Sequence, residues 1–498
     1  MNQSLHSRYN PRLEAERYIA SLSLNEKMRF FILIEPGLGY MIAPLRKRVP
    51  GAKIVALHAM KQSEFLSHPD VTAPHDGAAE AEWFPETGIS VRDFLEREIP
   101  DSEAREIRIL EWRPALALYG EAYLSLIEES ADYIKRADAN TRTLKAFGRR
   151  WFRNFFKNLE IVKKVICPFQ LPVPLVVTGA GPGLEDTLSL IRSGRESVFI
   201  MAVSSSVPAL EAGNIIPDMV ISTDGGYWAR FHLYDLVRSR PQVSGQNGIN
   251  CPLAAALSAA LPSQCAEFPI LPISDGSLWQ TLILRELGIP FISLPQRGTV
   301  SASALDLAFA LAEGDVYIAG IDLANRDIRS HSRPYSLDRF LEEKEGRLNP
   351  VYSQTYGRSS MLKTGGSYGI YASWFEKQLA AYPKRLHSLG KNNAVFGLAE
   401  NTVIDNPSVQ TKNAVESKAG AFFKTVTVPL YEDPSRKALA VLEKVLKDPC
   451  AAKREPGSLS EKLSAEIGAL LFPGRTELPL NELLETLHSP GRGSPANG

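Results

Sequence analysis

The sequence predicts an α/β protein with a Rossmann-like central domain on a parallel sheet, a smaller α/β N-terminal domain and a helical C-terminal region. Short apolar runs of strand length alternate with helical segments through the middle of the chain. A glycine-rich turn follows one of those runs, and helical spacing dominates beyond about Asp405. For 498 residues, a prior of roughly 150 residues per domain favours about three units.

The N-terminal part reads as a βαβ unit. The charge pattern from Pro11 to Tyr18 indicates a short amphipathic helix, and the apolar run from Arg29 to Glu35 has the length of a buried strand. A helix from Pro44 to Arg48 and a strand from Ala52 to His58 complete the unit. The turn Pro36-Gly-Leu-Gly39 resembles a degenerate nucleotide-binding turn, but we favour a glycine pair needed only for close helix–strand packing.

A helical connector is predicted from about Glu103 to Lys164, where apolar residues recur at helical spacing among many charges. Three prolines between Cys167 and Pro174 exclude a helix interior, so we place the main domain boundary there. The predicted domains are residues 1–165, 166–404 and 405–488, followed by a disordered Gly/Pro/Ser tail at 489–498.

The central domain is predicted to alternate strands with helices, which implies a parallel sheet covered by helices. The predicted strands are Leu175 to Thr178, Ser197 to Val203, Met219 to Ser222, Phe268 to Ile273, Phe291 to Leu294 and Val316 to Ala319. The predicted helices are Leu184 to Arg192, Ala209 to Ala212 and Ala302 to Ala312, with Arg436 to Lys447 and Ser460 to Leu471 in the C-terminal region.

Composition argues against several functional classes. Lys plus Arg and Asp plus Glu both number 56, so no net charge draws the chain to nucleic acid or to an anionic membrane. The four cysteines form no CxxC pair, which disfavours a zinc knuckle or a disulfide framework and suits a reducing compartment. The N-terminus is polar, and no apolar stretch reaches the roughly 18 residues of a membrane span. We therefore expect a cytoplasmic protein.

Ligands of an open parallel sheet bind at the carboxyl ends of strands, and three such ends carry informative residues. At the first, glycines allow backbone amides to approach a phosphate at the start of a helix. Glu185 and Asp186 in that helix satisfy its dipole themselves and would repel a phosphate, so a purely structural turn is the alternative. The candidate nucleotide-binding residues here are Gly179, Ala180, Gly181, Pro182 and Gly183.

At the second end, hydroxyl groups could hold a ribose or a base. The candidates are Ser204 and Ser205 after one strand and Thr223 after the next, while Asp224 could take a ribose hydroxyl or a divalent cation. Ordinary turn chemistry also favours Ser and Asp-Gly. His232, eight residues beyond Asp224, is interpreted as a helix-surface or core histidine.

At the third end, a polar loop opens an Ala/Leu-rich helix and a neighbouring strand delivers Gly320 and Asp322. Thr299 and Ser301 are candidate nucleotide ligands, or simply an N-cap worth about 1 kcal/mol to the helix.

The segment after Asp322 places Arg326, Arg329 and Arg333 around His331. Arginine suits diphosphate or carboxylate recognition, and histidine is the usual general base near neutral pH. A solvated loop is the alternative. No Gly-x-Ser-x-Gly elbow, Walker lysine or His-Glu-x-x-His motif lies where the predicted elements would support it, so hydrolase and P-loop interpretations lose ground.

Several of these motifs together resemble the motility-associated-factor family of flagellin glycosyltransferases. They are Gly179-Ala-Gly-Pro-Gly183, Pro217-Asp218 with Thr223-Asp224, and Gly320-Ile-Asp-Leu-Ala324 followed by Ser330-His331. This resemblance covers roughly Pro174 to Leu398, and the segment from His6 to Pro11 with Gly37 to Tyr40 resembles the family's N-terminal domain. Gly183 stands where the family usually has serine, which removes one hydroxyl donor.

The resemblance implies transfer of a nonulosonic acid, of pseudaminic or legionaminic type, from a CMP-activated donor to Ser or Thr hydroxyls of flagellin. The segment from Ser301 to Leu323 is also similar to family 42 sialyltransferases. By resemblance, the glycine turn, Ser204, Ser205 and Asp224 contact phosphate and ribose. His331 is then the acceptor-side base, and Asp322 supports or replaces it. The expected partners are the CMP-activated donor and flagellin, with no nucleic acid.

Two alternatives stay open. The same superfamily includes MptE-like proteins, which transfer diphosphate from ATP to a hydroxymethyl-dihydropterin. That reaction would need Mg²⁺, with Asp224 and Asp322 as natural ligands, whereas glycosyl transfer implies no certain cofactor. The other alternative is a non-enzymatic flagellin-binding or motility scaffold that retains only the fold. The large N-terminal unit suits recognition of a protein acceptor, which favours the glycosyltransferase.

Overall fold

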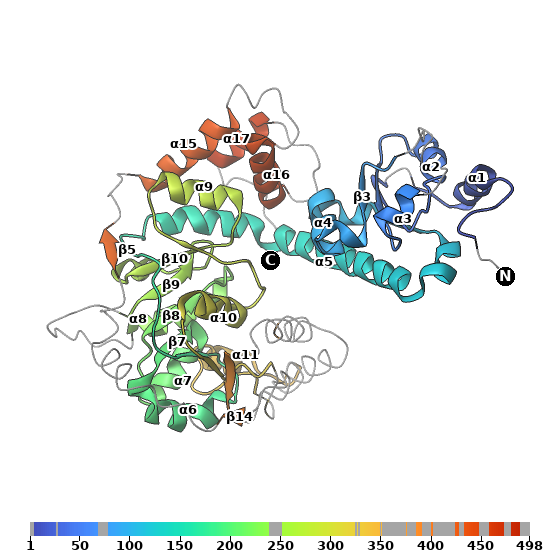
Figure 1. Cartoon of the computed structure of the whole chain (residues 1–498). Coiled ribbons are helices and arrows are strands. Elements are labelled where there is room, and N and C mark those ends of the chain that lie inside the picture. Colours follow the sequence, from blue (N-terminus) through green and yellow to red (C-terminus); the bar gives the residue numbers. More distant parts are fainter. Residues whose placement is uncertain are drawn as a thin grey trace. The chain divides into compact units, whose positions relative to one another are not determined.

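The computed structural model describes residues 4–25, 28–67, 78–238, 251–323, 326, 329–348, 350, 375, 385–390, 400–401, 424–427, 433–447, 458–472 and 480–488. The chain divides into two compact units, Met1–Gly148 with Gly468–Pro479 and Arg149–Ile467 with Leu480–Gly498. Each unit is built on a sheet of mainly parallel strands with helices, which confirms the predicted α/β class (Figure 1). The predicted division into three domains stays a prediction, and the tail at 489–498 lies outside the described residues.

The first unit contains a four-stranded parallel sheet in the order β3-β2-β1-β4. The helix between β1 and β2 confirms the predicted βαβ arrangement. The strands are β1 (Phe30–Ile34), β2 (Lys53–Leu57), β3 (Ala81–Trp83) and β4 (Ile107–Glu111). The helices are α1 (Pro11–Ser21), α2 (Ile42–Arg48), α3 (Gln62–Ser67), α4 (Val91–Glu98) and the first part of α5 (Leu116–Leu159).

The helical connector was predicted from about Glu103 to Lys164, and only its part from Leu116 to Leu159 is the helix α5. Ahead of α5, β4 pairs with β1 in parallel, so the segment beginning at Glu103 includes a strand that the sequence pattern concealed. β4 is an edge strand with exposed Arg108, and its charges resemble those of an amphipathic helix. Gly120, at φ +46°, interrupts the helical backbone near the start of α5.

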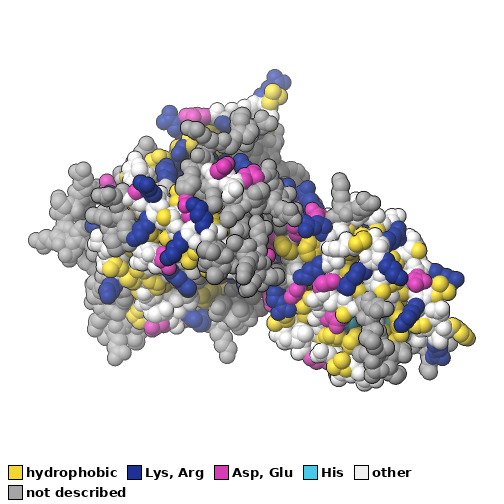
Figure 2. All heavy atoms as spheres, turned by 90° about the horizontal axis from the view of Figure 1, so that it is seen from above, with side chains coloured by type: hydrophobic (Ala, Val, Ile, Leu, Met, Phe, Trp, Pro, Cys, Tyr) yellow, Lys and Arg dark blue, Asp and Glu magenta, His cyan; other side chains and the backbone are white. Residues whose placement is uncertain are grey.

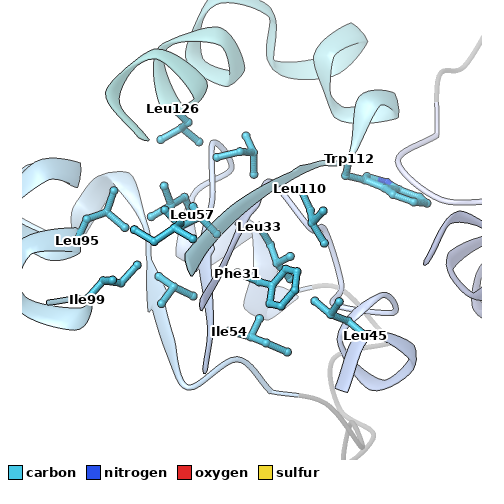
Figure 3. Packing of buried hydrophobic residues seen from close by; sticks show 14 of the residues in the cluster. Phe31, Leu33, Leu45, Ile54, Leu57, Leu95, Ile99, Leu110, Trp112 and Leu126 are labelled. Carbon is cyan, nitrogen blue, oxygen red and sulfur yellow. The ribbon is translucent and has the colours of Figure 1, made fainter. Parts of the chain in front are cut away.

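The core of the first unit forms where β1 is covered on both faces. Figure 3 shows Phe31 and Leu33 of β1 together with Leu45 of α2, Ile54 of β2 and Leu110 of β4. Each of these side chains is at most 2% exposed, and complete burial of one such side chain stabilises a fold by about 1.5–3 kcal/mol. A strand buried on both faces is apolar throughout, which is why this run was recognisable in the sequence.

The glycine turn after β1 is explained by packing. The buried carboxylate of Glu35 accepts hydrogen bonds from the backbone amides of Gly37 (3.2 Å), Ala59 (2.6 Å) and Met60 (2.9 Å). A Cβ at Gly37 would lie 2.3 Å from Nε2 of His6. These contacts support the interpretation of this turn as a structural one.

The second unit contains a sheet in the order β14-β13-β12-β6-β7-β8-β9-β10-β5-β15, with β11 beside β10. Its pairs are parallel, except that β15 is antiparallel to β5. The predicted strands are all present. β5, β9, β13, β14 and β15 were not predicted, and the alanine-rich β9 was missed because alanine has a low strand propensity. The strands are β5 (Lys164–Ile166), β6 (Leu175–Thr178), β7 (Phe199–Val203), β8 (Met219–Ser222), β9 (Leu253–Ala256), β10 (Ile270–Ser274), β11 (Ile292–Ser293), β12 (Val316–Ala319), β13 (Leu386–Leu389), β14 (Glu400–Asn401) and β15 (Thr425–Thr427).

Helices cover this second sheet. α10 packs against β6, β7 and β8, and Figure 1 shows α6 and α7 near the β14 end and α9 and α15 near the β5 end. The helices of this unit are α6 (Leu184–Ser193), α7 (Val207–Ala212), α8 (Arg230–Arg238), α9 (Leu278–Glu286), α10 (Val300–Leu311), α11 (Asp338–Lys344), α15 (Pro434–Leu446) and α17 (Leu480–His488). α16 (Leu459–Leu471) begins in this unit, and its residues from Gly468 on are assigned to the first unit.

The strand order of the second sheet reverses between β6 and β12. From β6 the chain adds β7, β8, β9 and β10 on one side, whereas β12 and β13 lie on the other side. Such a reversal leaves a crevice at the carboxyl ends of the two strands. Because Thr178 of β6 pairs with Ala319 of β12, the turns at Gly179 and Gly320 meet at this point.

The surface carries both signs of charge. Lys and Arg side chains are interspersed with Asp and Glu on the face that Figure 2 draws, in line with the formal net charge of zero. Among the described residues, no helix combines the length and the apolar character needed to span a membrane.

Candidate functional site

A cavity of about 250 Å³ lies at the carboxyl ends of β6, β7, β8 and β12. It therefore joins the three strand ends that the sequence marked separately. The predicted site residues in its lining are Ala180, Gly181, Ser204, Ser205, Asp224, Thr299, Ser301, Gly320, Asp322 and His331. The predicted site residues outside its lining are Gly179, Pro182, Gly183 and Thr223.

The turns after β6 and β12 pack too closely for side chains. A Cβ at Gly179 would lie 2.5 Å from the carbonyl oxygen of Gly320, and one at Gly181 would lie 2.6 Å from Oδ2 of Asp322. Gly320 also has φ +63°, a backbone conformation that favours glycine. Close approach of the two strand ends is therefore sufficient to require glycine at these three positions.

The backbone amides of the first turn donate within the protein. Gly179 donates to the carbonyl of Ala319 (2.8 Å), and Gly181 donates to that of Gly320 (2.7 Å). The amide of Gly183, at the start of α6, donates to Oδ2 of Asp322 at 2.5 Å. A side-chain carboxylate thus occupies the N-terminus of α6, where the sequence placed a phosphate. A phosphate in the cavity would need other donors.

Asp322 is only 5% exposed. Burial raises the pKa of its carboxyl group, while the hydrogen bond from Gly183 and the charge of Arg326 act in the opposite direction. The net upward shift favours the protonated form compared with an ordinary aspartate. Asp322 joins the two turns and also presents a carboxyl group to the cavity.

The arginine-rich segment after β12 is held by acidic residues of α6. Arg326 forms two hydrogen bonds with Asp186, and Nη1 of Arg329 lies 2.8 Å from Oε1 of Glu185. The same Glu185 oxygen accepts the backbone amide of Arg333 at 2.8 Å. These carboxylates, which would have repelled a phosphate, are therefore paired, and Arg326 and Arg329 serve to fix the segment that carries the predicted base.

Two histidines line the cavity from different elements. Nδ1 of His331 lies 2.9 Å from the Ser330 hydroxyl, and its ring stacks on Tyr335 with centroids 4.1 Å apart and planes 7° apart. His232 of α8 lies 5.2 Å from the same tyrosine ring and is 8% exposed. His232 is thus a buried histidine of a helix, as one of the two interpretations had it, and it also forms part of the cavity wall.

The start of α10 faces the cavity through Thr299, Val300 and Ser301. Thr299 occupies the N-cap position with φ −141° and ψ 141°, but its side chain makes no capping hydrogen bond. The first turn of α10 contains no acidic residue. Because a helix N-terminus presents backbone N–H groups and partial positive charge, α10 suits an anion better than α6, whose N-terminus Asp322 occupies.

Two carboxylates line the cavity. Asp322 is buried, whereas Asp224 is exposed and accepts the amide of Gly226 at 2.7 Å. No group of three His, Cys, Asp or Glu side chains suited to a metal ion occurs in the part of the chain that the structure describes. Mg²⁺ held by one or two carboxylates together with substrate phosphates does not require such a group, so Asp224 fits a role as a single protein ligand.

One family model matches a part of the second unit. Residues 149–327 match the family model described as 6-hydroxymethylpterin diphosphokinase MptE-like. The matched segment starts where the second unit starts and extends past β12, so it contains every strand end of the cavity.

Similar sequences occur in Treponema pallidum (strain Nichols), where they are named uncharacterized proteins. One is 28% identical over 292 residues, which cover 58% of this chain and 61% of that protein. A second is 31% identical over 110 residues, 22% of this chain and 51% of the relative. The chain thus spans about three fifths of the length of the first relative and about half of the length of the second.

The fold is similar to the structure of a MAf glycosyltransferase from Magnetospirillum magneticum AMB-1. The TM-score is 0.54 with 13% sequence identity, and the alignment covers 98% of this chain and 78% of the other. At this identity the similarity concerns the fold. It is consistent with the family resemblance seen in the sequence motifs.

Proposed function

We propose that this protein is a glycosyltransferase that transfers a nonulosonic acid from a CMP-activated donor to Ser or Thr hydroxyls of flagellin. One observation carries the proposal: a single cavity at the switch point of the sheet combines a hydroxyl-bearing wall, the uncapped start of α10 and two histidines. The similarity in fold to a MAf glycosyltransferase supports it.

In this proposal the donor phosphate binds at the start of α10. The hydroxyls of Thr299 and Ser301 and the N–H groups of the first turn supply donors, without a competing acid in that turn. Ser204 and Ser205, at the end of β7, face the same cavity and suit the ribose. The glycine turn shapes the wall through Gly181, because most of its amides are already engaged.

His331 is the proposed acceptor-side base. When Nδ1 is protonated and donates to the Ser330 hydroxyl, Nε2 carries the lone pair that removes the acceptor proton. The stacked ring of Tyr335 fixes the plane of the imidazole. As the acceptor oxygen bonds to the anomeric carbon, the bond to the CMP phosphate breaks, and the N-terminus of α10 stabilises the charge that develops on the phosphate.

Asp322 has a supporting role in this scheme. Its carboxyl group accepts the hydrogen bond of Gly183 and thereby holds the turn after β12 against the turn after β6. Residues on both turns line the cavity, so Asp322 fixes the wall beside His331.

A second candidate function is favoured by the family-model match. An MptE-like protein would transfer diphosphate from ATP to a hydroxymethyl-dihydropterin, with Asp224 holding Mg²⁺ together with the ATP phosphates. The start of α10 would then hold a phosphate of ATP, so the same geometry serves either nucleotide. Nucleotide preference separates the two functions.

Isothermal titration with CMP and with ATP plus Mg²⁺ tests the choice directly. We expect CMP to bind the wild-type protein and Ser301→Ala to weaken CMP binding, while Ser263→Ala, at an exposed serine that is not part of the cavity lining, leaves it unchanged. Binding of ATP and Mg²⁺ without CMP would favour the diphosphokinase. Binding of neither nucleotide would favour a scaffold.

Activity provides the second test. His331→Asn should lower kcat by about 10²–10⁴, the usual contribution of a general base, while CMP affinity is retained. Intact-mass measurement of flagellin from a deletion strain would show the loss of the sugar. An unchanged flagellin mass would reject this acceptor.

A further inference from the structure

We infer that an exposed aromatic surface beside the cavity docks a polypeptide acceptor in which apolar or aromatic residues flank the reactive Ser or Thr. The aromatic surface consists of Tyr227, Trp228, Phe231 and Phe340. The inference rests on the proposed function, since it identifies where the acceptor of that reaction binds.

The four rings form one continuous cluster contributed by the 3-10 helix Tyr227–Ala229, by α8 and by α11. Trp228 lies 4.1 Å from Phe340 of α11, 5.5 Å from Phe231 of α8 and 5.3 Å from Tyr227, all between ring centroids. Tyr227 is 50% exposed and Trp228 is 44% exposed. Large exposed rings of these types are characteristic of binding hot spots, where their flat faces become buried by a partner.

The aromatic surface continues directly from the cavity wall. Tyr227 and Trp228 lie in the chain between Asp224 and Ala229, both of which line the cavity. In the second segment, Tyr335 lines the cavity just ahead of α11 and precedes Phe340 by five residues. A ligand on the rings would therefore lie next to the part of the wall that carries the two histidines.

The size of the cavity places the acceptor outside it. At about 250 Å³ it lies just below the roughly 300–1,000 Å³ of pockets that enclose a drug-sized ligand. An activated sugar nucleotide would fill it, so a protein acceptor has to lie across its mouth. In an extended chain, residues two to four positions from the reactive hydroxyl are roughly 7–13 Å away, which allows them to contact the rings while the hydroxyl enters the cavity.

Charge on the aromatic surface is compatible with an apolar polypeptide. The Arg230 guanidinium lies 3.5 Å from the Tyr227 ring centroid, and the Lys344 ammonium lies 4.6 Å from that of Phe340. These cations already lie over two of the rings. The exposed face of Trp228 then offers mainly hydrophobic contact, which suits leucine, phenylalanine or a similar side chain.

Peptide binding tests the inference without depending on catalysis. Two fluorescent peptides of about a dozen residues, with one central serine flanked by leucines or by glycines, are titrated by anisotropy. We expect the leucine peptide to bind about tenfold more tightly, and Trp228→Ala and Tyr227→Ala each to remove about that factor. Tyr9→Ala, at a fully exposed tyrosine of the first unit, is the matched control and should change neither affinity.

Transfer kinetics and the oligomeric state of the protein distinguish acceptor docking from other roles of the aromatic surface. With a CMP-activated donor, the two ring variants should raise KM for the leucine peptide about tenfold and leave kcat and CMP affinity unchanged. Equal peptide affinity in wild type and in both variants would overturn the inference, even if transfer proceeds. A second result would also overturn the inference: light scattering shows that the wild type is a dimer and the ring variants are monomers, while peptide affinity is unchanged. The rings would then bind a second copy of this chain.

Failure of the proposed function gives a different pattern. In that case CMP would not bind the wild-type protein, while ring-dependent binding of the leucine peptide would still support docking at the aromatic surface. Trp228→Phe, which keeps a ring against Phe340, should retain most of the affinity, and circular dichroism of each variant excludes loss of the fold as the cause.

Discussion

The Asp322 carboxylate accepts a 2.5 Å hydrogen bond from the backbone amide of Gly183, a residue 139 positions earlier in the chain. This contact joins the carboxyl ends of β12 and β6 at the point where the strand order reverses. It also occupies the N-terminus of α6. The proposed phosphate position therefore moves to α10, whose N-cap side chain makes no capping bond.

Removal of this carboxylate should destabilise the second unit. Asp322→Ala leaves the buried Gly183 amide without its acceptor, which costs about 1–3 kcal/mol. Asp322→Asn keeps a carbonyl oxygen that can accept the same bond and should cost less. Denaturant unfolding of both variants measures the difference, and equal stability of the alanine variant and wild type would contradict it.

The raised pKa of Asp322 predicts a pH-dependent difference from Asp322→Asn. Because burial raises the folded-state pKa above the ordinary 3.8, the folded protein binds the proton more tightly than the unfolded chain does. The stabilisation is fully present below pH 3.8 and is lost as the pH rises through the folded-state pKa. Thermal unfolding across this range should therefore show that the stability of Asp322→Asn increases relative to wild type as the pH rises. A stability difference that does not change with pH would contradict the raised pKa.

Glycine at position 179 should be required by packing alone. A Cβ there meets the Gly320 carbonyl at 2.5 Å, and backbone cannot move aside as a side chain can. We expect Gly179→Ala to cost about 1–3 kcal/mol of unfolding free energy. Gly314→Ala, where a Cβ meets nothing within 4 Å, is the matched control and should stay within about 0.5 kcal/mol of wild type.

Thr299 should matter for nucleotide binding rather than for helix stability. Its side chain makes no capping bond, whereas the Asp433 side chain accepts the Arg436 amide at 2.7 Å at the start of α15. Asp433→Ala should therefore cost about 1 kcal/mol, and Thr299→Ala much less. In calorimetric titration, Thr299→Ala should weaken CMP binding and Asp433→Ala should not. If Thr299→Ala instead cost about 1 kcal/mol of stability and left CMP binding unchanged, Thr299 would be an N-cap residue and not a nucleotide ligand.

Glu185 should hold the loop that carries His331. Its Oε1 accepts both the Arg329 side chain and the Arg333 amide, so Glu185→Ala should increase hydrogen exchange over residues 329–335 and lower kcat. Global stability should change by less than about 1 kcal/mol, as expected of a partly exposed ion pair. Glu185→Gln keeps an acceptor and should show a smaller effect. Unchanged exchange in the alanine variant would contradict this role.

The sequence alone determined the local elements and much of the candidate site. Apolar runs such as Leu175 to Thr178 and Val316 to Ala319 identified strands with their observed bounds, because a strand buried on both faces is apolar at every position. The rule that ligands bind at strand ends then selected a set of residues, most of which line one cavity; Gly179, Pro182, Gly183 and Thr223 do not. Edge strand β4 and alanine-rich β9 were not predicted, since neither carries a clear strand pattern. The short strands β3, β5, β13, β14 and β15 were not predicted either.

Only the tertiary structure decided which strand ends meet and which groups are already engaged. Strand order depends on contacts between distant segments, so the reversal between β6 and β12 could not be read from local periodicity. The same is true of His232 and Tyr335, which come together from separate elements. The glycine turn that suggested a phosphate site forms a close contact between two strand ends. The Gly183 amide of this turn already donates a hydrogen bond to Asp322.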